Sequence, residues 1–214
     1  MPVEPEIKRA IVFVDSQNLF YAVKKAFGYS YSNYDIAGLA STICLKMNWQ
    51  HGQTRFYTGI PSIDDKPFWH HFWSAKLAMM GGRQKIHVFS RTLRYRNQTI
   101  LLSDGTTRTI LVGQEKGEDV RIALNIVRLA REKQYDVALI FSQDQDLSEA
   151  AEEVRLIAAQ QDRWIKLASA FPVSPAITDN RGINKTDWIK IDRKTYDSCI
   201  DPKDYRLKKQ PELL

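Results

Sequence analysis

Apolar residues fall into short continuous runs that alternate along this chain with segments in which they recur every three or four residues. The runs at residues 10–14 (AIVFV) and 136–141 (DVALIF) are rich in β-branched residues, which is typical of strands buried on both faces. Similar runs predict further strands at residues 54–58, 85–89 and 164–168, and an edge strand within residues 183–191.

The segments between these strands have helical spacing. It predicts helices over residues 19–27, 35–47, 67–80, 119–131 and 146–159. Because strands and helices alternate, we predict an α/β fold with a mainly parallel central sheet flanked by helices. One segment departs from this alternation. Residues 99–102 and 107–112 flank an Asp104–Gly105 pair, which predicts an inserted β-hairpin.

No internal repeat, low-complexity tract or domain boundary interrupts the sequence pattern. We therefore predict a single domain over residues 1–214. Its core spans about residues 9–192, the hairpin insertion about residues 91–113, and a polar C-terminal tail about residues 193–214.

The composition excludes several classes of protein. Hydrophobic residues make up 43% of the chain, with only 10 Gly and 8 Pro, which excludes fibrous and disordered chains. No apolar run approaches the ~20 residues that cross a bilayer, and the acidic start is unlike a secretion signal. Cys44 and Cys199 are too few for a disulfide framework or a cysteine zinc site, so we expect buried thiols in a reducing compartment. These features predict a cytoplasmic protein.

Carboxylates lie where predicted strands end and predicted helices begin. Asp15 closes the first strand in VFVDSQN, and Asp119 starts a helix in KGEDV. Asp144 and Asp146 follow the strand DVALIF in FSQDQD. Each of these residues alone is explained as a helix cap, which stabilises a helix by about 1 kcal/mol.

Together the same carboxylates have a second interpretation. In an open parallel sheet, ligands bind beyond the carboxyl ends of the strands. Carboxylates gathered there repel one another unless a cation neutralises them. Oxygen ligands of this kind select hard cations, so the sequence indicates a site for Mg²⁺ or Mn²⁺.

The motifs VFVDSQN, KGEDV and FSQDQDL, in this order and spacing, resemble those of NYN domains, the LabA-like group of PIN-like ribonucleases. The resemblance covers roughly residues 9–191, and INKTDWIKID matches a strand near the end of the family. It implies a PIN-like, Rossmann-like α/β sandwich. It also implies metal-dependent cleavage of RNA phosphodiester bonds.

The resemblance further implies roles for individual residues. Four of them would form the catalytic set that binds Mg²⁺ or Mn²⁺: Asp15, Asp119, Asp144 and Asp146. Asn18 would orient a ligand or a water, and Ser142 would support the turn or touch phosphate. Lys116 would stabilise the charge of the scissile phosphate.

Two positions depart from the family pattern. Gln143 stands where a glycine is more frequent, and Asn125 stands where the family has an aspartate. Asn125 leaves open whether one or two metal ions bind. Glu118 could compensate for the missing carboxylate, but its position next to Asp119 is expected to point it elsewhere on the helix.

Positive charge concentrates in and beside the predicted hairpin. The net charge of +6 is by itself a weak indication of a polyanionic partner. Between residues 83 and 108, however, basic side chains accompany a single acid, and these are Arg83, Lys85, Arg91, Arg94, Arg96 and Arg108. We predict an RNA clamp in which Arg91, Arg94 and Arg96 contact phosphates and Tyr95 stacks on a base. The alternative is a solvated ribbon whose charges discourage edge pairing.

An aromatic stretch, FWHHFW, occupies residues 68–73 of a predicted helix. Trp69, Phe72 and Trp73 share one helix face, so we expect them to pack in the core. The alternative is a surface for a partner protein or for a second copy of the chain. His70 and His71 belong to the same stretch, and the histidines of the chain lack the spacing of zinc ligands.

These observations favour a metal-dependent ribonuclease, an endoribonuclease that hydrolyses RNA at an acidic Mg²⁺ or Mn²⁺ site. A second hypothesis is a catalytically inactive RNA-binding or regulatory module of the same fold, which Asn125 and Gln143 leave open. A third is a phosphatase of the haloacid-dehalogenase type. Its chemistry normally requires an aspartate two residues after the first, where Gln17 stands.

Overall fold

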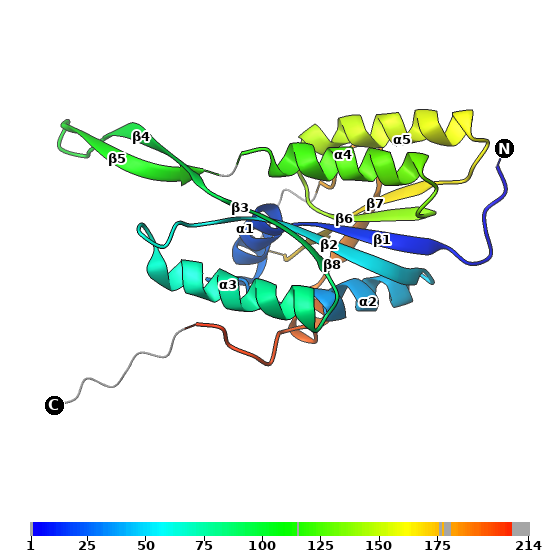
Figure 1. Cartoon of the computed structure of the whole chain (residues 1–214), viewed down its shortest axis with the longest axis horizontal. Helices are drawn as coiled ribbons and strands as arrows, with labels where there is room; N and C mark the ends of the chain where they lie inside the picture. Colours follow the sequence, from blue (N-terminus) through cyan, green and yellow to red (C-terminus); the bar gives the residue numbers. More distant parts are fainter. Residues whose placement is uncertain (1, 115, 176, 178–180, 207–214) are drawn as a thin grey trace.

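Six parallel strands form the central sheet of the computed structural model, which describes residues 2–114, 116–175, 177 and 181–206. Their order across the sheet is β3-β2-β1-β6-β7-β8 (Figure 1). The strands are β1 (Arg9–Asp15), β2 (Gln50–Ile60), β3 (His87–Thr92), β6 (Val137–Phe141), β7 (Lys166–Pro172) and β8 (Asp187–Ile191). Every pairing between neighbours is parallel, so the predicted α/β fold with a parallel central sheet is confirmed.

The strand order reverses at β1. From β1 the chain proceeds outward through β2 to β3, and it then returns to β6 on the opposite side of β1. The carboxyl ends of β1 and β6 therefore lie side by side, with Val14 opposite Phe141. Ligands of open parallel sheets bind at such a switch point. Asp15 and Ser142, the next residues along the two segments, lie at this edge of the sheet.

Helices cover both faces of the sheet (Figure 1). On one face lie α1 (Ser16–Phe27), α2 (Ile36–Lys46) and α3 (Pro67–Gly82), and on the other lie α4 (Glu118–Arg131) and α5 (Ser148–Gln160). Alternate residues of β1 belong to the two hydrophobic cores and are all buried, with Ala10, Val12 and Val14 in one and Ile11 and Phe13 in the other. Burial on both faces explains why residues 10–14 form a continuous apolar run.

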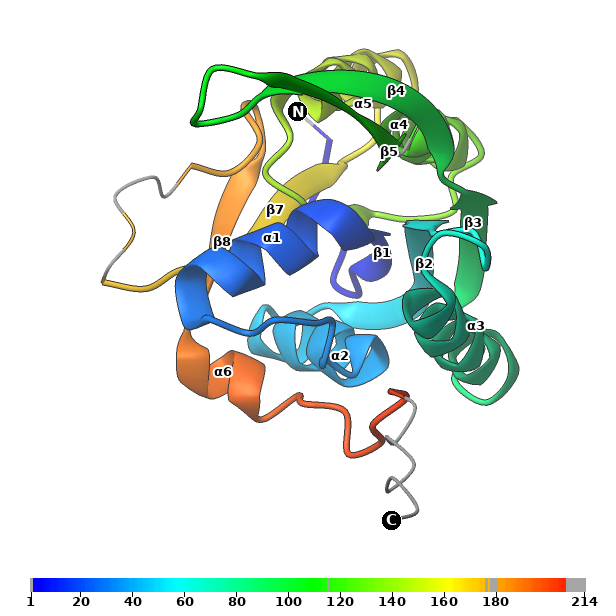
Figure 2. The same ribbon diagram turned by 90° about the vertical axis from the view of Figure 1, so that its left-hand side faces the viewer.

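The predicted hairpin is present. Its strands β4 (Arg94–Leu101) and β5 (Thr107–Gln114) pair antiparallel around Gly105, whose φ of +82° is readily adopted by glycine. The hairpin extends from the end of the sheet at which β1 and β6 terminate (Figures 1 and 2). At its base, the Tyr95 hydroxyl accepts a hydrogen bond from the Ser62 backbone N–H (2.9 Å).

Some predicted boundaries were wrong by a few residues. β2 begins at Gln50 rather than at 54, whereas β8 (Asp187–Ile191) lies within the segment predicted for the edge strand. α5 begins at Ser148 rather than at 146. The reason for this last shift is that the Asp144 side chain accepts a hydrogen bond from the Asp146 backbone N–H and closes a 3₁₀ turn before the helix.

One short helix, α6 (Arg193–Asp197), lies in the segment for which a polar tail was predicted. Asp192 caps it, accepting a hydrogen bond from the Thr195 backbone N–H (2.7 Å). Tyr196 is buried and its hydroxyl donates to the Asn33 side chain (2.7 Å). Contacts to distant residues hold this helix, and local apolar spacing does not reveal such contacts. Residues 207–214 of the predicted tail lie outside the described residues.

Two expectations drawn from the composition can also be compared with the structure. Cys44 and Cys199 are free and buried, as predicted. Within the part of the chain that the structure describes, no helix combines the length and the apolar character needed to cross a membrane.

Candidate functional site

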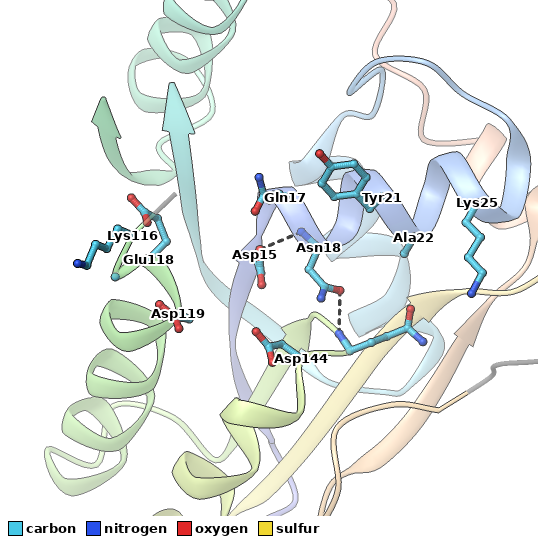
Figure 3. Close-up of a pocket in the computed structure, with 12 residues that line it drawn as sticks. Asp15, Gln17, Asn18, Tyr21, Ala22, Lys25, Lys116, Glu118, Asp119 and Asp144 are labelled. Atoms are coloured by element: carbon cyan, nitrogen blue, oxygen red, sulfur yellow. Dashed lines mark hydrogen bonds between the residues drawn. The ribbon is translucent and has the colours of Figure 1, made fainter. Parts of the chain in front are cut away.

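An open pocket of about 570 Å³ lies at the carboxyl ends of β1 and β6, where the strand order reverses (Figure 3). We call it the acidic pocket, because four carboxylates line it: Asp15, Glu118, Asp119 and Asp144. Two exposed lysines, Lys25 and Lys116, and the amide of Asn18 also belong to its lining. The fold thus brings three of the four predicted acidic residues to one place.

Asp15 ends β1 and caps α1. Its Oδ1 accepts a hydrogen bond from the Asn18 backbone N–H (3.0 Å), and its Oδ2 accepts one from the Ser142 hydroxyl (3.2 Å). Burial raises the pKa of Asp15 to about 6; the two hydrogen bonds oppose this rise, and the charges of Asp144 and Asp119 add to it. The three carboxylates therefore lie within electrostatic reach of one another.

The turn after β6 is held by hydrogen bonds to itself and to α1. Ser142 is buried, and its hydroxyl accepts a hydrogen bond from the Asp144 backbone N–H (3.1 Å) while donating to Asp15. The side-chain oxygen of Asn18 accepts a hydrogen bond from the Gln143 backbone N–H (2.9 Å; Figure 3). Asn18 and Ser142 thus set the position of Asp144 relative to Asp15.

Glu118, the residue that could compensate for the carboxylate missing at position 125, also lines the acidic pocket. It is 5% exposed, and its Oε2 atom has no hydrogen-bond partner among the residues that the structure describes. Figure 3 shows the carboxylates of Glu118 and Asp119 on different sides of the start of α4. The acidic pocket surrounds the end of α4, which begins after Gly117 with its φ of +86°, so that two successive residues of the first turn reach it. Negative charge is favourable at this helix terminus, and a hydrophobic pattern gives no signal for it.

Asp146, by contrast, is not among the residues that line the acidic pocket. Its side chain is exposed, and its backbone N–H donates to Asp144 Oδ1 (3.0 Å). The 3₁₀ turn that begins here separates the two aspartates of FSQDQD. The structure therefore brings Asp144, but not Asp146, to Asp15 and Asp119.

Asn125, the first of the two residues that depart from the pattern of the resemblance, connects α4 to β2. It is buried, and its Nδ2 donates a hydrogen bond to the Tyr57 hydroxyl (2.8 Å). Burial raises the pKa of Tyr57, so this hydroxyl stays neutral. Asn125 satisfies a buried polar group and does not belong to the lining of the acidic pocket.

Gln143, the other departure from the family pattern, joins the turn after β6 to residues near β8. Its Nε2 donates a hydrogen bond to the Arg181 carbonyl (2.7 Å). Gln145 makes a similar bond to the Gly182 carbonyl (3.0 Å). A glycine at position 143 would lack the first of these bonds, so the glutamine contributes to holding the turn.

The predicted RNA-clamp arginines differ in their surroundings. Arg94 and Arg96 are exposed and lie two residues apart on β4, so they share a face of the hairpin. Arg91 lies on β3 instead. Its guanidinium stacks on the Phe89 ring (5.0 Å to the centroid) and donates to the Lys116 carbonyl (3.3 Å), which holds the segment before α4.

Tyr95 is half-buried at the base of the hairpin. An added Cβ on Gly113 would come within 2.9 Å of the Tyr95 ring, which shows how closely the two strands pack there. With its hydroxyl bonded to Ser62, Tyr95 anchors the hairpin to the rest of the molecule. The predicted role as an open face for base stacking therefore does not follow from its position.

The aromatic residues of α3 differ in how deeply they are buried. Trp69, Phe72 and Trp73 share a face as predicted, but only Phe72 is fully buried. Trp73 packs against the hydrophobic core with part of its surface, and Trp69 remains partly exposed. Both indoles line a second pocket between α1 and α3. Core packing therefore accounts for Phe72 and for part of Trp73.

The donors of the acidic pocket fit a hard divalent cation. Carboxylates are the ligands that Mg²⁺ and Mn²⁺ prefer, and the partnerless Glu118 Oε2 is a further buried acceptor. Among the described residues, however, no three acidic, histidine or cysteine side chains lie close enough to hold one ion. Mg²⁺ usually retains several waters and takes only one or two carboxylates directly. The lining therefore suits a partly hydrated ion and not an ion whose ligands all come from the protein.

A family model for the NYN domain matches residues 9–159, which is more than half of the chain. The chain therefore belongs to the NYN domain family, whose members are generally PIN-like nucleases. The match includes Asp15, Asp119 and Asp144. No match was found among curated proteins.

Comparison with solved structures found several similar chains. A protein of unknown function from Vibrio parahaemolyticus is 17% identical, with a TM-score of 0.50, and the alignment covers 89% of this chain and 98% of that one. Ribokinase from Giardia lamblia is 10% identical, with a TM-score of 0.37, over 81% of this chain and 53% of that one. MurG from Acinetobacter baumannii is 10% identical, with a TM-score of 0.31, and the alignment covers 86% of this chain and 45% of that one.

Proposed function

We propose that this NYN-domain protein is a divalent-metal-dependent endoribonuclease that hydrolyses RNA phosphodiester bonds in the acidic pocket. The observation that carries the proposal is the convergence of Asp15, Asp119 and Asp144 from three separate segments of the chain. Burial and mutual charge raise the pKa of Asp15 to about 6. Carboxylates with perturbed pKa values in a cleft are typical of functional sites. The family match supports the same class of chemistry.

In this proposal, one or two of Asp15, Asp119 and Asp144 would bind Mg²⁺ or Mn²⁺ directly and the rest would bind it through its waters, with Glu118 as an additional acceptor. The cation supplies, when bound, the positive charge that activates a water and neutralises the phosphate. The Ser142 hydroxyl and the Asn18 backbone N–H orient the two oxygens of Asp15. A carboxylate held in this way needs no rearrangement before the reaction.

The basic side chains of the proposed nuclease bind the RNA backbone. Lys116 is exposed beside Glu118 and Asp119, where its ammonium group can pair with the phosphate that is cut. Arg94 and Arg96 are exposed on β4, and the hairpin extends from the end of the sheet at which β1 and β6 terminate (Figure 1). Asp146 is exposed next to Asp144 and has a weaker claim to a catalytic role.

The experiment that tests the proposal is incubation of the full chain with labelled single-stranded, structured and circular RNAs. Cleavage is expected with Mg²⁺ or Mn²⁺ and not with EDTA. Because a circular RNA has no ends, its linearisation identifies an endonuclease. If no RNA is cut with either metal while the protein still binds RNA, the proposed activity is wrong.

A second candidate function is a catalytically inactive RNA-binding module of the same fold. The observation that favours it is the spacing of the carboxylates, since no three metal-binding side chains of the described residues reach a common ion. RNA affinity that is equal in Mg²⁺ and in EDTA, with no products, would support it. No observation favours the phosphatase, because Gln17 lines the acidic pocket where that chemistry requires an aspartate.

A further inference from the structure

A second pocket, of about 280 Å³, lies beside the acidic pocket, between α1 and α3. We call it the aromatic pocket, because its lining includes Phe20, Tyr21, Tyr31, Trp69, Phe72 and Trp73. Gln17 and Tyr21 line both pockets, so the two hollows adjoin along α1. Figure 2 shows α1 in the centre of the view, with the hairpin above it and α3 to its right.

The two indoles of the aromatic pocket are held in place by Phe72. Its buried ring meets Trp69 edge-to-face, with centroids 5.5 Å apart and an interplanar angle of 80°. It meets Trp73 in the same way, at 5.4 Å and 80°. Tyr21, on the opposite wall, is 57% exposed. Aromatic rings that are fixed but still partly exposed are the surfaces on which unpaired RNA bases stack.

We propose that the aromatic pocket binds the unpaired base of a nucleotide adjacent to the bond cut in the acidic pocket. This inference rests on the proposed function, since it assigns a substrate feature to that same site. The hydroxyl of Ser30 and the ammonium group of Lys66 also line the pocket, where they can meet the polar edge of a base and its phosphate. A base can enter only when it is not paired, so the protein selects single strands and loops over duplexes.

The hairpin adjoins the aromatic pocket and supplies the path for the strand. Leu93 lines the pocket, and its backbone N–H donates to the Ile60 carbonyl (2.9 Å) at the end of β2. The next residue, Arg94, begins β4 and is exposed. A strand held by the hairpin arginines can therefore reach the aromatic pocket at the start of β4.

The test measures binding in EDTA, so that it does not depend on cleavage. Labelled single-stranded hexaribonucleotides, one complete and six lacking a single base at successive positions, are titrated with the wild type and with Trp69→Ala by fluorescence anisotropy. At one position, loss of the base should weaken binding by about 10-fold, and Trp69→Ala should weaken binding of the complete strand by about as much. The two losses should not add, because they remove the same contact.

Three further variants accompany this measurement: a conservative replacement, a control and a substitute for Trp69→Ala. Trp69→Phe should restore most of the affinity, because it keeps an aromatic face. His71→Ala, at an exposed position of the same helix outside the pocket lining, should bind like the wild type. Tyr21→Ala, at an exposed position, repeats the base-deletion series if Trp69→Ala does not fold.

The outcomes separate the aromatic pocket from the nuclease activity. Additive losses, or equal binding of all seven strands, would overturn base binding even if RNA is cut. If the wild type is a dimer in light scattering, Trp69→Ala is a monomer, and removal of a base does not weaken RNA binding, a second copy of the chain occupies this surface instead. If base-dependent binding is observed but no RNA is cut with metal, base recognition stands and the proposed activity fails.

Discussion

The acidic pocket and the hairpin, which lie at the same end of the molecule, are built in opposite ways. The carboxylates of the pocket come from β1, from the start of α4 and from the turn after β6, which only the sheet brings together. The hairpin is local, because β4 and β5 pair with each other around a short turn. Its arginines Arg94 and Arg96 are exposed, whereas Asp15 and Glu118 are largely covered.

This difference separates two kinds of requirement. Carboxylates that hold a cation have to keep their oxygens in a set geometry, which needs a packed framework and neighbouring hydrogen bonds. Contacts to phosphates along a strand act through charge at longer range and tolerate mobile side chains. Substitutions in the acidic pocket should therefore change chemistry and stability, and substitutions on the hairpin should change affinity and its salt dependence.

The largest effect is expected for Asp144→Asn. Loss of one carboxylate from the pocket should reduce RNA cleavage by about 100-fold or more, while far-UV circular dichroism and thermal unfolding remain those of a folded protein. Asp146→Asn should cost less, because its side chain is exposed outside the pocket. Glu149→Gln, at an exposed position in the first turn of α5, is the matched control. An Asp144→Asn enzyme that cuts at the wild-type rate would refute the acidic site.

The pH dependence of stability should reveal the buried charge of Asp15. In the folded chain its pKa is about 6, above the ordinary value of 3.8, so the folded state binds the proton more tightly. The stability contributed by Asp15 should therefore fall as pH rises from about 4 to 6. In EDTA, Asp15→Asn should be more stable than the wild type by about 1–3 kcal/mol at pH 7 and equal to it below pH 4. Urea unfolding of both proteins across this range measures the difference, and a constant difference would contradict the shifted pKa.

Glu118→Gln tests whether the partnerless carboxylate is part of the cation site. In EDTA the unfolding temperature of each protein gives the reference for the measurement. Mn²⁺ should raise the unfolding temperature of the variant less than that of the wild type, because the variant has lost one oxygen ligand that carries negative charge. Differential scanning calorimetry with and without Mn²⁺ measures the two increases. A variant that responds to Mn²⁺ like the wild type would exclude Glu118 from the site.

The smallest effect is expected on the hairpin. Arg94→Ala combined with Arg96→Ala should weaken RNA binding by about 10-fold and lower the slope of affinity against salt concentration by about 1.4, with unfolding unchanged. The matched control is Arg128→Ala combined with Arg131→Ala, which removes the same charge from the last turn of α4. It should have less effect on RNA affinity and on the salt slope. Equal slopes for the two double variants would show that the hairpin is not an RNA clamp.

The fold was predictable where structure depends on local pattern. The apolar run at residues 10–14 is β1, α2 lies within the helix predicted over residues 35–47 and is capped by Asp35, and the Asp104–Gly105 pair forms the turn of the hairpin. In each case the deciding interaction lies within a few residues along the chain. α6 was missed because its buried Tyr196 is held by Asn33, which lies far away in the sequence.

The candidate site was predictable only in part, for a related reason. Motif order pointed to Asp15, Asp119 and Asp144, and the parallel sheet joins their segments into one pocket. Successive residues of a helix point in different directions, so the sequence favoured Asp119 over Glu118. Both nevertheless line the acidic pocket, because the pocket lies around the first turn of α4. Tyr95 was predicted to stack on a base because basic residues surround it in the sequence. In the structure its ring packs closely against Gly113, and its hydroxyl accepts a hydrogen bond from Ser62.

By itself, the sequence determined the alternation of strands and helices, the hairpin turn and the order of motifs that marks the family, because these depend on neighbouring residues. Only the tertiary structure decided which carboxylates share a pocket and which aromatic rings stay open beside it. The physical reason is that burial and hydrogen-bond partners arise between distant segments. Asp15 receives its hydrogen bond from a serine 127 residues away, and no local pattern contains that pair.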